Sequence, residues 1–189
     1  MKVSQANPPA GRFDQVFQMA SEATGTSFEY LLATAKRESS LRPELQARTS
    51  SATGLFQFIE QTWLSMIKEE GAELGLSSFA DAITVDAKGK ASVADQTTRQ
   101  QILDLRKDPT LSAIMAGRLT QKNAAQLESA LGRQPTDGEL YIAHFMGPTG
   151  ARKLIELATQ NPLASAAAAF PRAAEANRSI FYDKDGRAR

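Results

Sequence analysis

The stretch SFEYLLATAKRES, residues 27–39, has the pattern of an amphipathic helix. Ser27 is a good N-cap because its hydroxyl can accept a backbone N–H of the first turn. One face of the predicted helix is an apolar stripe of Phe28, Leu31, Leu32 and Ala35. Glu38 lies three residues after Ala35 and seven after Leu31, so a carboxylate continues this stripe. The pair Arg42-Pro43 is predicted to break the helix.

A carboxylate on an apolar helix face points to chemistry at Glu38. Burying it is costly unless the group is paired or protonated. Desolvation favours the neutral carboxyl, which is the form that a general acid needs near neutral pH. The alternative is that Glu38 lies at a frayed helix end, reaches solvent and pairs with Arg37 or Arg42. The periodicity by itself leaves both interpretations open.

Helical signals also dominate on both sides of this stretch. Before it, apolar residues from Phe13 to Ala23 recur at helical spacing, and Gly25 is predicted to end that helix. After it, a third helix is predicted from near Glu60 to Glu70, and Asp108-Pro109 supplies the N-cap and first position of another.

Two more helices are predicted towards the C-terminus. Thr136 to Glu139 has capping-box spacing, and the helix that it opens is predicted to end near Gly147. Asn161-Pro162 is predicted to start a helix that runs through the alanines 166–169.

The fold class that follows is a compact all-α domain over residues 12–182. Residues 71–94 are rich in Gly, Ser, Ala and Asp with weak periodicity, which predicts a long irregular surface excursion. No strand and no internal repeat are predicted. A flexible N-terminus, residues 1–11, and a charged tail, residues 183–189, flank the predicted domain.

The composition excludes several function classes. The 189 residues carry a net charge of +1 without a basic stripe, which argues against a nucleic-acid partner. There is no cysteine, so thiol catalysis and disulfides are excluded, and a single histidine excludes a multi-histidine metal site. No segment is apolar enough to span a membrane, and the first eleven residues lack the apolar run of a secretory signal.

A motif after Glu38-Ser39 strengthens the catalytic interpretation. The run SSATGLFQFI, residues 50–59, and then Thr62-Trp63 follow this pair. Together they resemble the signature of the soluble lytic transglycosylase (SLT) family, whose fold is lysozyme-like. That signature has a Glu-Ser pair at a helix end and, after a short spacer, Gly-Leu-Met-Gln, an apolar pair and a threonine. The matching positions are Glu38, Ser39, Ala52, Gly54, Leu55, Gln57 and Thr62. Phe56 replaces the family's methionine, and Glu60 stands where the family usually has proline.

The family's third motif, Ala-Tyr-Asn before a glycine, is altered here. Its match is the run AHFMG, residues 143–147, in which His144 replaces the tyrosine and Phe145 the asparagine. The family's tyrosine hydrogen-bonds near the catalytic glutamate. Either His144 or Tyr141, one helical turn earlier, is expected to take that role, and a core-lining histidine is the alternative. A hydrolytic triad built on His144 is disfavoured because no nucleophile-elbow motif accompanies it.

The resemblance implies cleavage of bacterial peptidoglycan by one carboxyl group. Glu38 would protonate the β-1,4 glycosidic oxygen between N-acetylmuramic acid and N-acetylglucosamine, while the substrate's N-acetyl group stabilises the sugar cation. Glu38 would then deprotonate the muramic C6 hydroxyl, which closes a 1,6-anhydro ring. The resemblance implies that this reaction needs neither a metal nor a cofactor. Most glycosidases use two carboxylates, and no second one stands at a motif position. Asp81, Asp86 and Asp95 remain candidates for a distant partner.

The remaining site residues receive substrate-binding roles from the resemblance. Ser39 would orient Glu38 or hold its backbone, or else present a hydroxyl to water. Gln57 would hydrogen-bond the sugar or its acetamido group, or else stabilise a turn. Phe56 would line the sugar cleft, or else belong to the core.

Two alternatives and an expected location accompany this interpretation. One alternative is a hydrolytic muramidase on the same fold. Another is a non-catalytic peptidoglycan-binding module that serves the assembly of a flagellum, a secretion system or a phage particle. The expected location is the periplasm or the cell wall, with glycan strands as the partner, although no export signal is seen.

Overall fold

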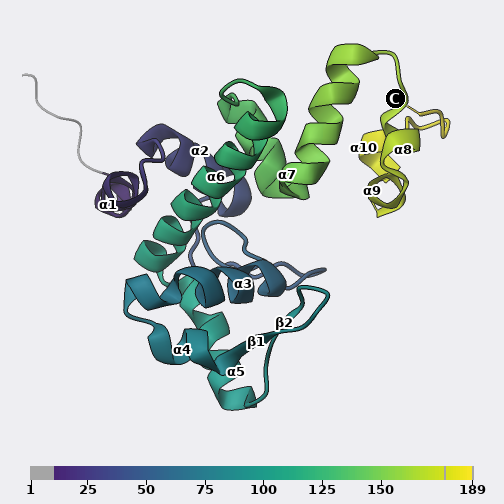
Figure 1. Cartoon of the computed structure of the whole chain (residues 1–189). Helices are drawn as coiled ribbons and strands as arrows, with labels where there is room; N and C mark the ends of the chain where they lie inside the picture. Colours follow the sequence, from purple (N-terminus) through teal and green to yellow (C-terminus); the bar gives the residue numbers. More distant parts are fainter. Residues whose placement is uncertain (1–10, 177, 189) are drawn as a thin grey trace, which may run out of the picture. The chain divides into compact units, whose positions relative to one another are not determined.

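The computed structural model describes residues 11–176 and 178–188, and these are mostly helical, as the sequence predicts (Figure 1). Its internal contacts divide the chain into two compact units, the first ending at Lys122 and the second beginning at Asn123. The predicted N-terminal segment, residues 1–11, lies outside the described residues except for Gly11, and the predicted domain of residues 12–182 stays a prediction.

The first unit contains the helices predicted from residues 13 to 70. In chain order its elements are α1 (Asp14–Thr24), α2 (Phe28–Ser39), α3 (Glu60–Glu70), η1 (Gly71–Leu74), α4 (Ser77–Ala82), β1 (Ile83–Val85), β2 (Ala91–Val93), α5 (Gln96–Asp104), η2 (Leu105–Lys107) and the first part of α6 (Pro109–Leu131). The predicted caps are confirmed. Ser27 accepts the backbone N–H of Tyr30, and Asp108 accepts that of Leu111 at 2.7 Å.

Residues 71–94 are regular, so the prediction of an irregular excursion without strands was wrong. They form η1, α4 and an antiparallel β1–β2 hairpin in which Thr84 pairs with Ser92. Asp86 closes the hairpin turn, because its Oδ1 accepts the backbone N–H groups of Lys88 at 2.8 Å and Lys90 at 2.9 Å. Each strand has only three residues, which is too short for a period-2 pattern to stand out in the sequence.

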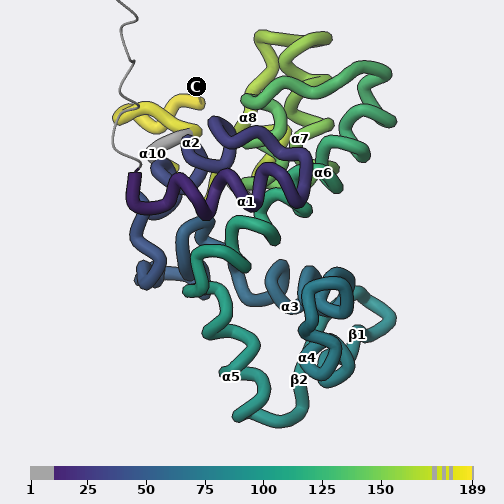
Figure 2. Tube along the Cα trace, turned by 90° about the vertical axis from the view of Figure 1, so that its left-hand side faces the viewer, coloured from purple at the N-terminus to yellow at the C-terminus, as the bar shows by residue number. Residues whose placement is uncertain are grey.

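One continuous hydrophobic core fills the first unit. Figure 2 shows α3, α4 and the hairpin gathered beside α5, and these elements contact one another. Trp63 of α3 is fully buried there and donates its Nε1–H to the carbonyl of Ile102 in α5 at 2.8 Å. Phe17 of α1 extends the same core to Phe56, which lies in the segment between α2 and α3. The segment after α2 is therefore packed between helices that lie far apart in the sequence.

The second unit contains the rest of α6, then α7 (Asp137–Gln160), α8 (Ala166–Ala169), α9 (Pro171–Ala176) and α10 (Arg178–Phe181). The predicted capping box is confirmed at the start of α7, between Thr136 and Glu139. Gly147 has non-helical angles (φ 74°, ψ 161°), so the first helical run ends where predicted and Pro148 opens a second one.

Near the C-terminal end, one predicted helix begins late and the predicted tail forms a turn. The helix expected from Asn161-Pro162 begins only at Ala166, because Ser165 supplies the cap by accepting the N–H of Ala168. The predicted tail forms a turn over its described part, in which Asp183 Oδ1 accepts the N–H groups of Asp185 and Arg187.

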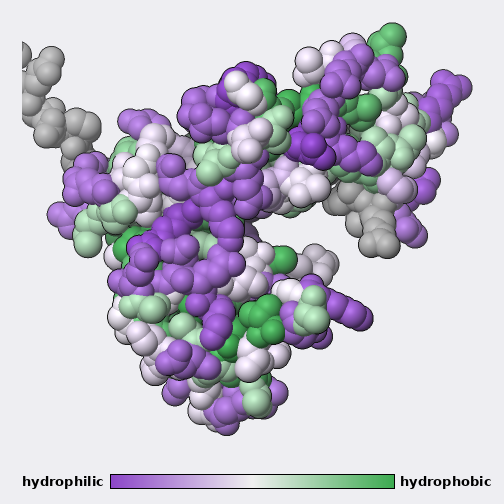
Figure 3. Space-filling model, in the orientation of Figure 1, coloured by the Kyte–Doolittle hydropathy of each residue, from purple (hydrophilic) through white to green (hydrophobic). Residues whose placement is uncertain are grey.

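Hydrophilic side chains predominate on the face shown in Figure 3, and the hydrophobic ones there are scattered in small groups. Among the described helices, none combines the length and the apolar character that a bilayer crossing requires.

Candidate functional site

Glu38 lies in the last turn of α2 and is half-buried. Leu31 and Ala35, on the same stripe, are fully buried. Phe28 and Leu32 are half-buried, so Glu38 continues a stripe that is buried only in part. The helix ends at Ser39, and Ser40 takes the left-handed conformation (φ 53°). The predicted break at Arg42-Pro43 is therefore three residues late, because the αL residue ends the helix first.

Ser39 holds the backbone at the end of α2. Its side chain is buried, with only 1% of the residue exposed, so the interpretation of a hydroxyl facing water is wrong. The hydroxyl donates to the carbonyl of Ala35 at 3.1 Å and accepts the N–H of Arg42 at 3.2 Å. Arg42 Nε donates to the Ser39 carbonyl at 3.0 Å. These bonds fix the turn that follows Glu38 and support the predicted role of Ser39 in holding the local backbone.

The segment from 45 to 58 folds back on itself around Thr53. This residue forms antiparallel bridges with Gln46 on one side and Phe58 on the other. Gly54 donates its N–H to the carbonyl of Leu45 at 2.9 Å and has φ 88°, a left-handed value that favours glycine. The Gly-Leu-Phe-Gln motif therefore forms a tight, hydrogen-bonded loop, which we call the motif loop and define as residues 51–58.

Gln57 stabilises the motif loop through its side chain. It is half-buried, and its Nε2 donates to the carbonyl of Leu45 at 3.1 Å and to that of Gly54 at 2.9 Å. An amide nitrogen carries two hydrogens, so both side-chain N–H groups of Gln57 can be donated to these backbone carbonyls. The turn-stabilising interpretation is supported. A hydrogen bond from Gln57 to a sugar, which stays a prediction, would use the amide oxygen as acceptor.

Phe56 lies in the core. It is fully buried, and its ring meets the Phe17 ring edge-on, with the centroids 6.2 Å apart. This arrangement supports the core interpretation, and a contact between Phe56 and a sugar stays a prediction.

Backbone strain is concentrated after Glu38. Among the described residues, the non-glycine positions with positive φ are Ser40 (53°), Leu41 (59°) and Gln57 (48°). Such conformations cost on the order of 1–3 kcal/mol each and cluster at functional sites. They are least common for bulky side chains such as leucine. This observation is independent of the sequence motif and selects the same segment of the chain.

Arg106 of η2 contacts the motif loop, although no sequence pattern predicted a role for it. Only 7% of it is exposed, and its Nε donates to the carbonyl of Leu103 at 2.9 Å. Its Nη1 donates to the carbonyls of Ser51 at 2.6 Å and Phe58 at 3.1 Å, the two ends of the motif loop. Burial lowers the pKa of the guanidinium below its ordinary value, while the charges of Glu60 and Asp104 act to raise it. No local pattern distinguishes Arg106 from Lys107 in the sequence, so nothing signalled this contact.

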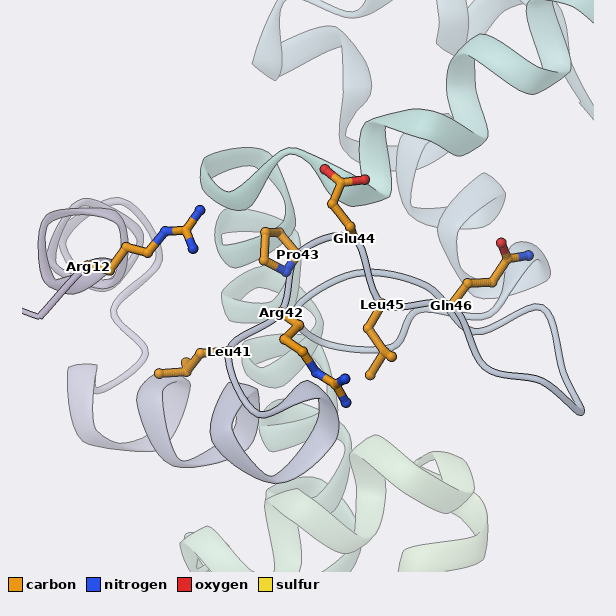
Figure 4. A pocket seen from close by; sticks show the side chains of 7 residues that line it. All are labelled: Arg12, Leu41, Arg42, Pro43, Glu44, Leu45 and Gln46. Atoms are coloured by element: carbon orange, nitrogen blue, oxygen red, sulfur yellow. The ribbon is translucent and has the colours of Figure 1, made fainter.

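A cavity of about 430 Å³ is lined mainly by residues of the segment that follows α2. It is lined by Arg12, Leu41, Arg42, Pro43, Glu44, Leu45 and Gln46. Figure 4 shows the Arg12 guanidinium directed towards Pro43, with the side chains of Arg42 and Leu45 beside one another. The volume lies within the range of small-ligand pockets, and the lining combines arginine, glutamate and apolar side chains.

The altered third motif lies in the second unit, on the first run of α7. The rings of Tyr141 and His144 stack, with centroids 6.3 Å apart and an interplanar angle of 14°. Both residues are half-exposed, whereas Ala143 between them is buried and Phe145 is 70% exposed. His144 is thus not enclosed in the core. Support of Glu38 by His144 or Tyr141 stays a prediction, because these residues belong to a different unit from Glu38.

Two of the three candidate partner carboxylates have structural tasks. Hydrogen bonds from the backbone of Lys90 and Lys88 lower the pKa of Asp86. Hydrogen bonds from Thr98 at the start of α5 likewise lower the pKa of Asp95, whose side chain is the N-cap. Asp86 thus closes the hairpin and Asp95 caps a helix.

Over residues 11–176 and 178–188, no group of three or more His, Asp or Glu residues is placed to hold a metal ion. The chain matches no family model.

Proposed function

We propose that this chain is a lytic transglycosylase that cleaves the β-1,4 bond between N-acetylmuramic acid and N-acetylglucosamine in peptidoglycan. The observation that carries the proposal is the arrangement around the end of α2. There the half-buried Glu38 is followed directly by strained backbone at Ser40 and Leu41 and then by the motif loop. Three of the residues that match the family signature, Ser39, Gly54 and Gln57, make hydrogen bonds in this arrangement.

Glu38 acts twice in the proposed reaction. As a general acid it protonates the glycosidic oxygen as the bond to the muramic anomeric carbon breaks. The substrate's N-acetyl oxygen stabilises the cation, so one carboxyl group suffices. Glu38 then takes the proton of the muramic C6 hydroxyl, whose oxygen bonds the anomeric carbon. The products are a 1,6-anhydromuramic end and a new N-acetylglucosamine end, and no water is consumed.

The other residues of the candidate site have secondary roles in this scheme. Ser39 holds the backbone next to Glu38, and the amide oxygen of Gln57 is the atom left to accept a hydrogen bond from the sugar. His144 or Tyr141 of α7 would hydrogen-bond near the carboxyl group. Such an enzyme works in the periplasm or at the cell wall, and needs neither metal nor cofactor.

The decisive experiment is digestion of purified sacculi by wild type and by Glu38→Gln. Loss of the general acid is expected to lower the cleavage rate by about 1,000-fold. Glu29→Gln is the matched control, since Glu29 is an exposed glutamate on the first turn of the same helix and should leave the rate unchanged.

The digestion products separate the alternatives. Mass spectrometry should find 1,6-anhydromuramic ends. Products heavier by one water would identify a hydrolytic muramidase instead. Binding of sacculi without cleavage by wild type would identify a non-catalytic module, and equal rates for wild type and Glu38→Gln would refute the mechanism.

A further inference from the structure

We propose that Arg106 is a positioning residue for this reaction, acting through the motif loop on Gln57. This inference rests on the proposed function, because it assigns a part in catalysis to a side chain that does not touch the substrate.

Arg106 holds the motif loop at both ends and in the middle. Its Nη1 binds the carbonyls of Ser51 and Phe58, which begin and end the loop. Its own backbone carbonyl faces Gly54 so closely that a Cβ there would come within 2.1 Å of the oxygen. A single residue from η2 therefore restrains the loop at three points.

Thr53 connects these contacts to one another. The Ser51 carbonyl accepts from Arg106 and also from the Thr53 hydroxyl at 3.3 Å. The Phe58 carbonyl accepts from Arg106 and also from the Thr53 N–H at 3.2 Å. The two loop carbonyls that Arg106 binds are thus also bound by Thr53, the residue before Gly54.

Gln57 is joined to the same network through Gly54. Its backbone N–H and its side-chain Nε2 both donate to the Gly54 carbonyl, at 3.3 Å and 2.9 Å. The orientation of the Gln57 amide oxygen therefore depends on the position of Gly54. The backbone oxygen of Arg106 lies against Gly54 and restrains that position. Gln57 also has positive φ, a conformation that persists only where the surroundings enforce it.

The chemistry of the contact explains why arginine stands here. The planar guanidinium presents several N–H donors at fixed angles, so it can reach the carbonyls of Leu103, Ser51 and Phe58 together. The ammonium group of lysine, on its flexible side chain, cannot reproduce this fixed arrangement of N–H donors. Lysine at this position should keep the charge and lose part of the geometry.

The test compares Arg106→Met and Arg106→Lys with wild type in the full chain. The control is Arg118→Met, because Arg118 of α6 forms ion pairs with Glu70 and Glu73 in the same unit. Steady-state cleavage of purified glycan strands is measured at a temperature where circular dichroism shows every variant folded. We expect kcat to fall at least tenfold in Arg106→Met with a smaller change in KM, and to recover partly in Arg106→Lys. The control should keep kcat within about twofold.

A double-mutant cycle with Gln57→Ala distinguishes positioning from general stabilisation. If Arg106 acts through Gln57, adding Gln57→Ala to Arg106→Met should lower kcat by much less than it does in wild type. Additive effects, or folded Arg106 variants with wild-type kcat, would overturn the inference.

Hydrogen exchange separates a failure of this inference from a failure of the proposed function. Faster exchange of the 52–58 amides in the Arg106 variants, and not in Arg118→Met, is expected whether or not the chain is an enzyme. If wild type shows no Glu38-dependent cleavage, the proposed function fails and the catalytic part of the inference fails with it. If cleavage depends on Glu38 while exchange and kcat are unchanged in the Arg106 variants, only the inference fails. Should Arg106→Met not fold, Arg106→Lys and Arg106→Gln carry the same comparison.

Discussion

The backbone carbonyl of Arg106 occupies the space that a side chain on Gly54 would need, because a Cβ built on Gly54 comes within 2.1 Å of that oxygen. Gly54 also has φ 88°. We expect Gly54→Ala to lower the free energy of unfolding by about 3 kcal/mol or more, since the left-handed backbone and the clash both add to the cost. Urea-induced unfolding followed by tryptophan fluorescence measures this, because Trp63 lies in the same core.

Gly25→Ala is the matched control for that variant. Gly25 has a similar φ of 74°, but nothing lies within 4 Å of its Cβ position. Its replacement should cost only about 1 kcal/mol, the conformational part. Equal losses in the two variants would contradict a close approach of Arg106 to Gly54.

The side chain of Gln57 gives a second prediction. Gln57→Glu keeps the shape and removes both donors, which leaves the carbonyls of Leu45 and Gly54 without these partners and faces them with a negative group. We expect a loss of about 2 kcal/mol in unfolding free energy. Gln46→Glu, on an exposed side chain of the same segment, should change stability by less than about 0.5 kcal/mol. A neutral Gln57→Glu would refute the loop-stabilising role.

Acid should weaken the start of α7. Hydrogen bonds from Arg133 and then from Thr136 lower the pKa of Glu139 from 4.5 to about 2. A carboxyl group whose pKa is lowered on folding stabilises the protein above its unfolded-state pKa, and this contribution disappears as pH falls through the folded value. The stabilisation is therefore complete above about pH 4.5 and lost towards pH 2.

The measurement compares wild type with Glu139→Gln, which can still accept the Thr136 N–H. The difference in thermal stability should be at most about 1 kcal/mol, because the Arg133 side chain is 51% exposed and water screens the pair. It should shrink from about pH 5 downward. A difference that stays constant to pH 2 would show that the charge of Glu139 contributes nothing.

The third motif gives a prediction that depends on the proposed function. If His144 takes the role of the family's tyrosine, His144→Ala should lower kcat by about tenfold or more, whereas His144→Tyr should retain most of it. Tyr141→Phe tests the other candidate, since it removes only the hydroxyl from the stacked pair. A large effect in Tyr141→Phe with none in His144→Ala would assign the role to Tyr141. Both His144 and Tyr141 are half-exposed, so these variants are expected to fold.

The helices and their ends were largely predictable because the interactions that define them are local. Ser27, Asp108 and Thr136 each accept a backbone N–H three residues ahead, as the cap patterns predict. Gly25 ends α1 for an equally local reason, its left-handed backbone. The misses were short elements, the three-residue strands and the late start of α8, for which few residues carry a pattern.

The candidate site was predictable only in part. That Glu38 ends an apolar stripe and that a Gly-Leu-Phe-Gln run follows could be read from the sequence, because both are matters of order and spacing. The packing of the folded chain was needed to show that Phe56 belongs to the core. It was also needed to show that Gln57 donates both side-chain N–H groups to backbone carbonyls and that Arg106 binds the two ends of the motif loop. Arg106 and Ser51 are 55 residues apart in the chain, and no local pattern encodes such a contact. It exists because packing of η2 against the loop brings a buried guanidinium to carbonyl groups that would otherwise lose their hydrogen bonds to water.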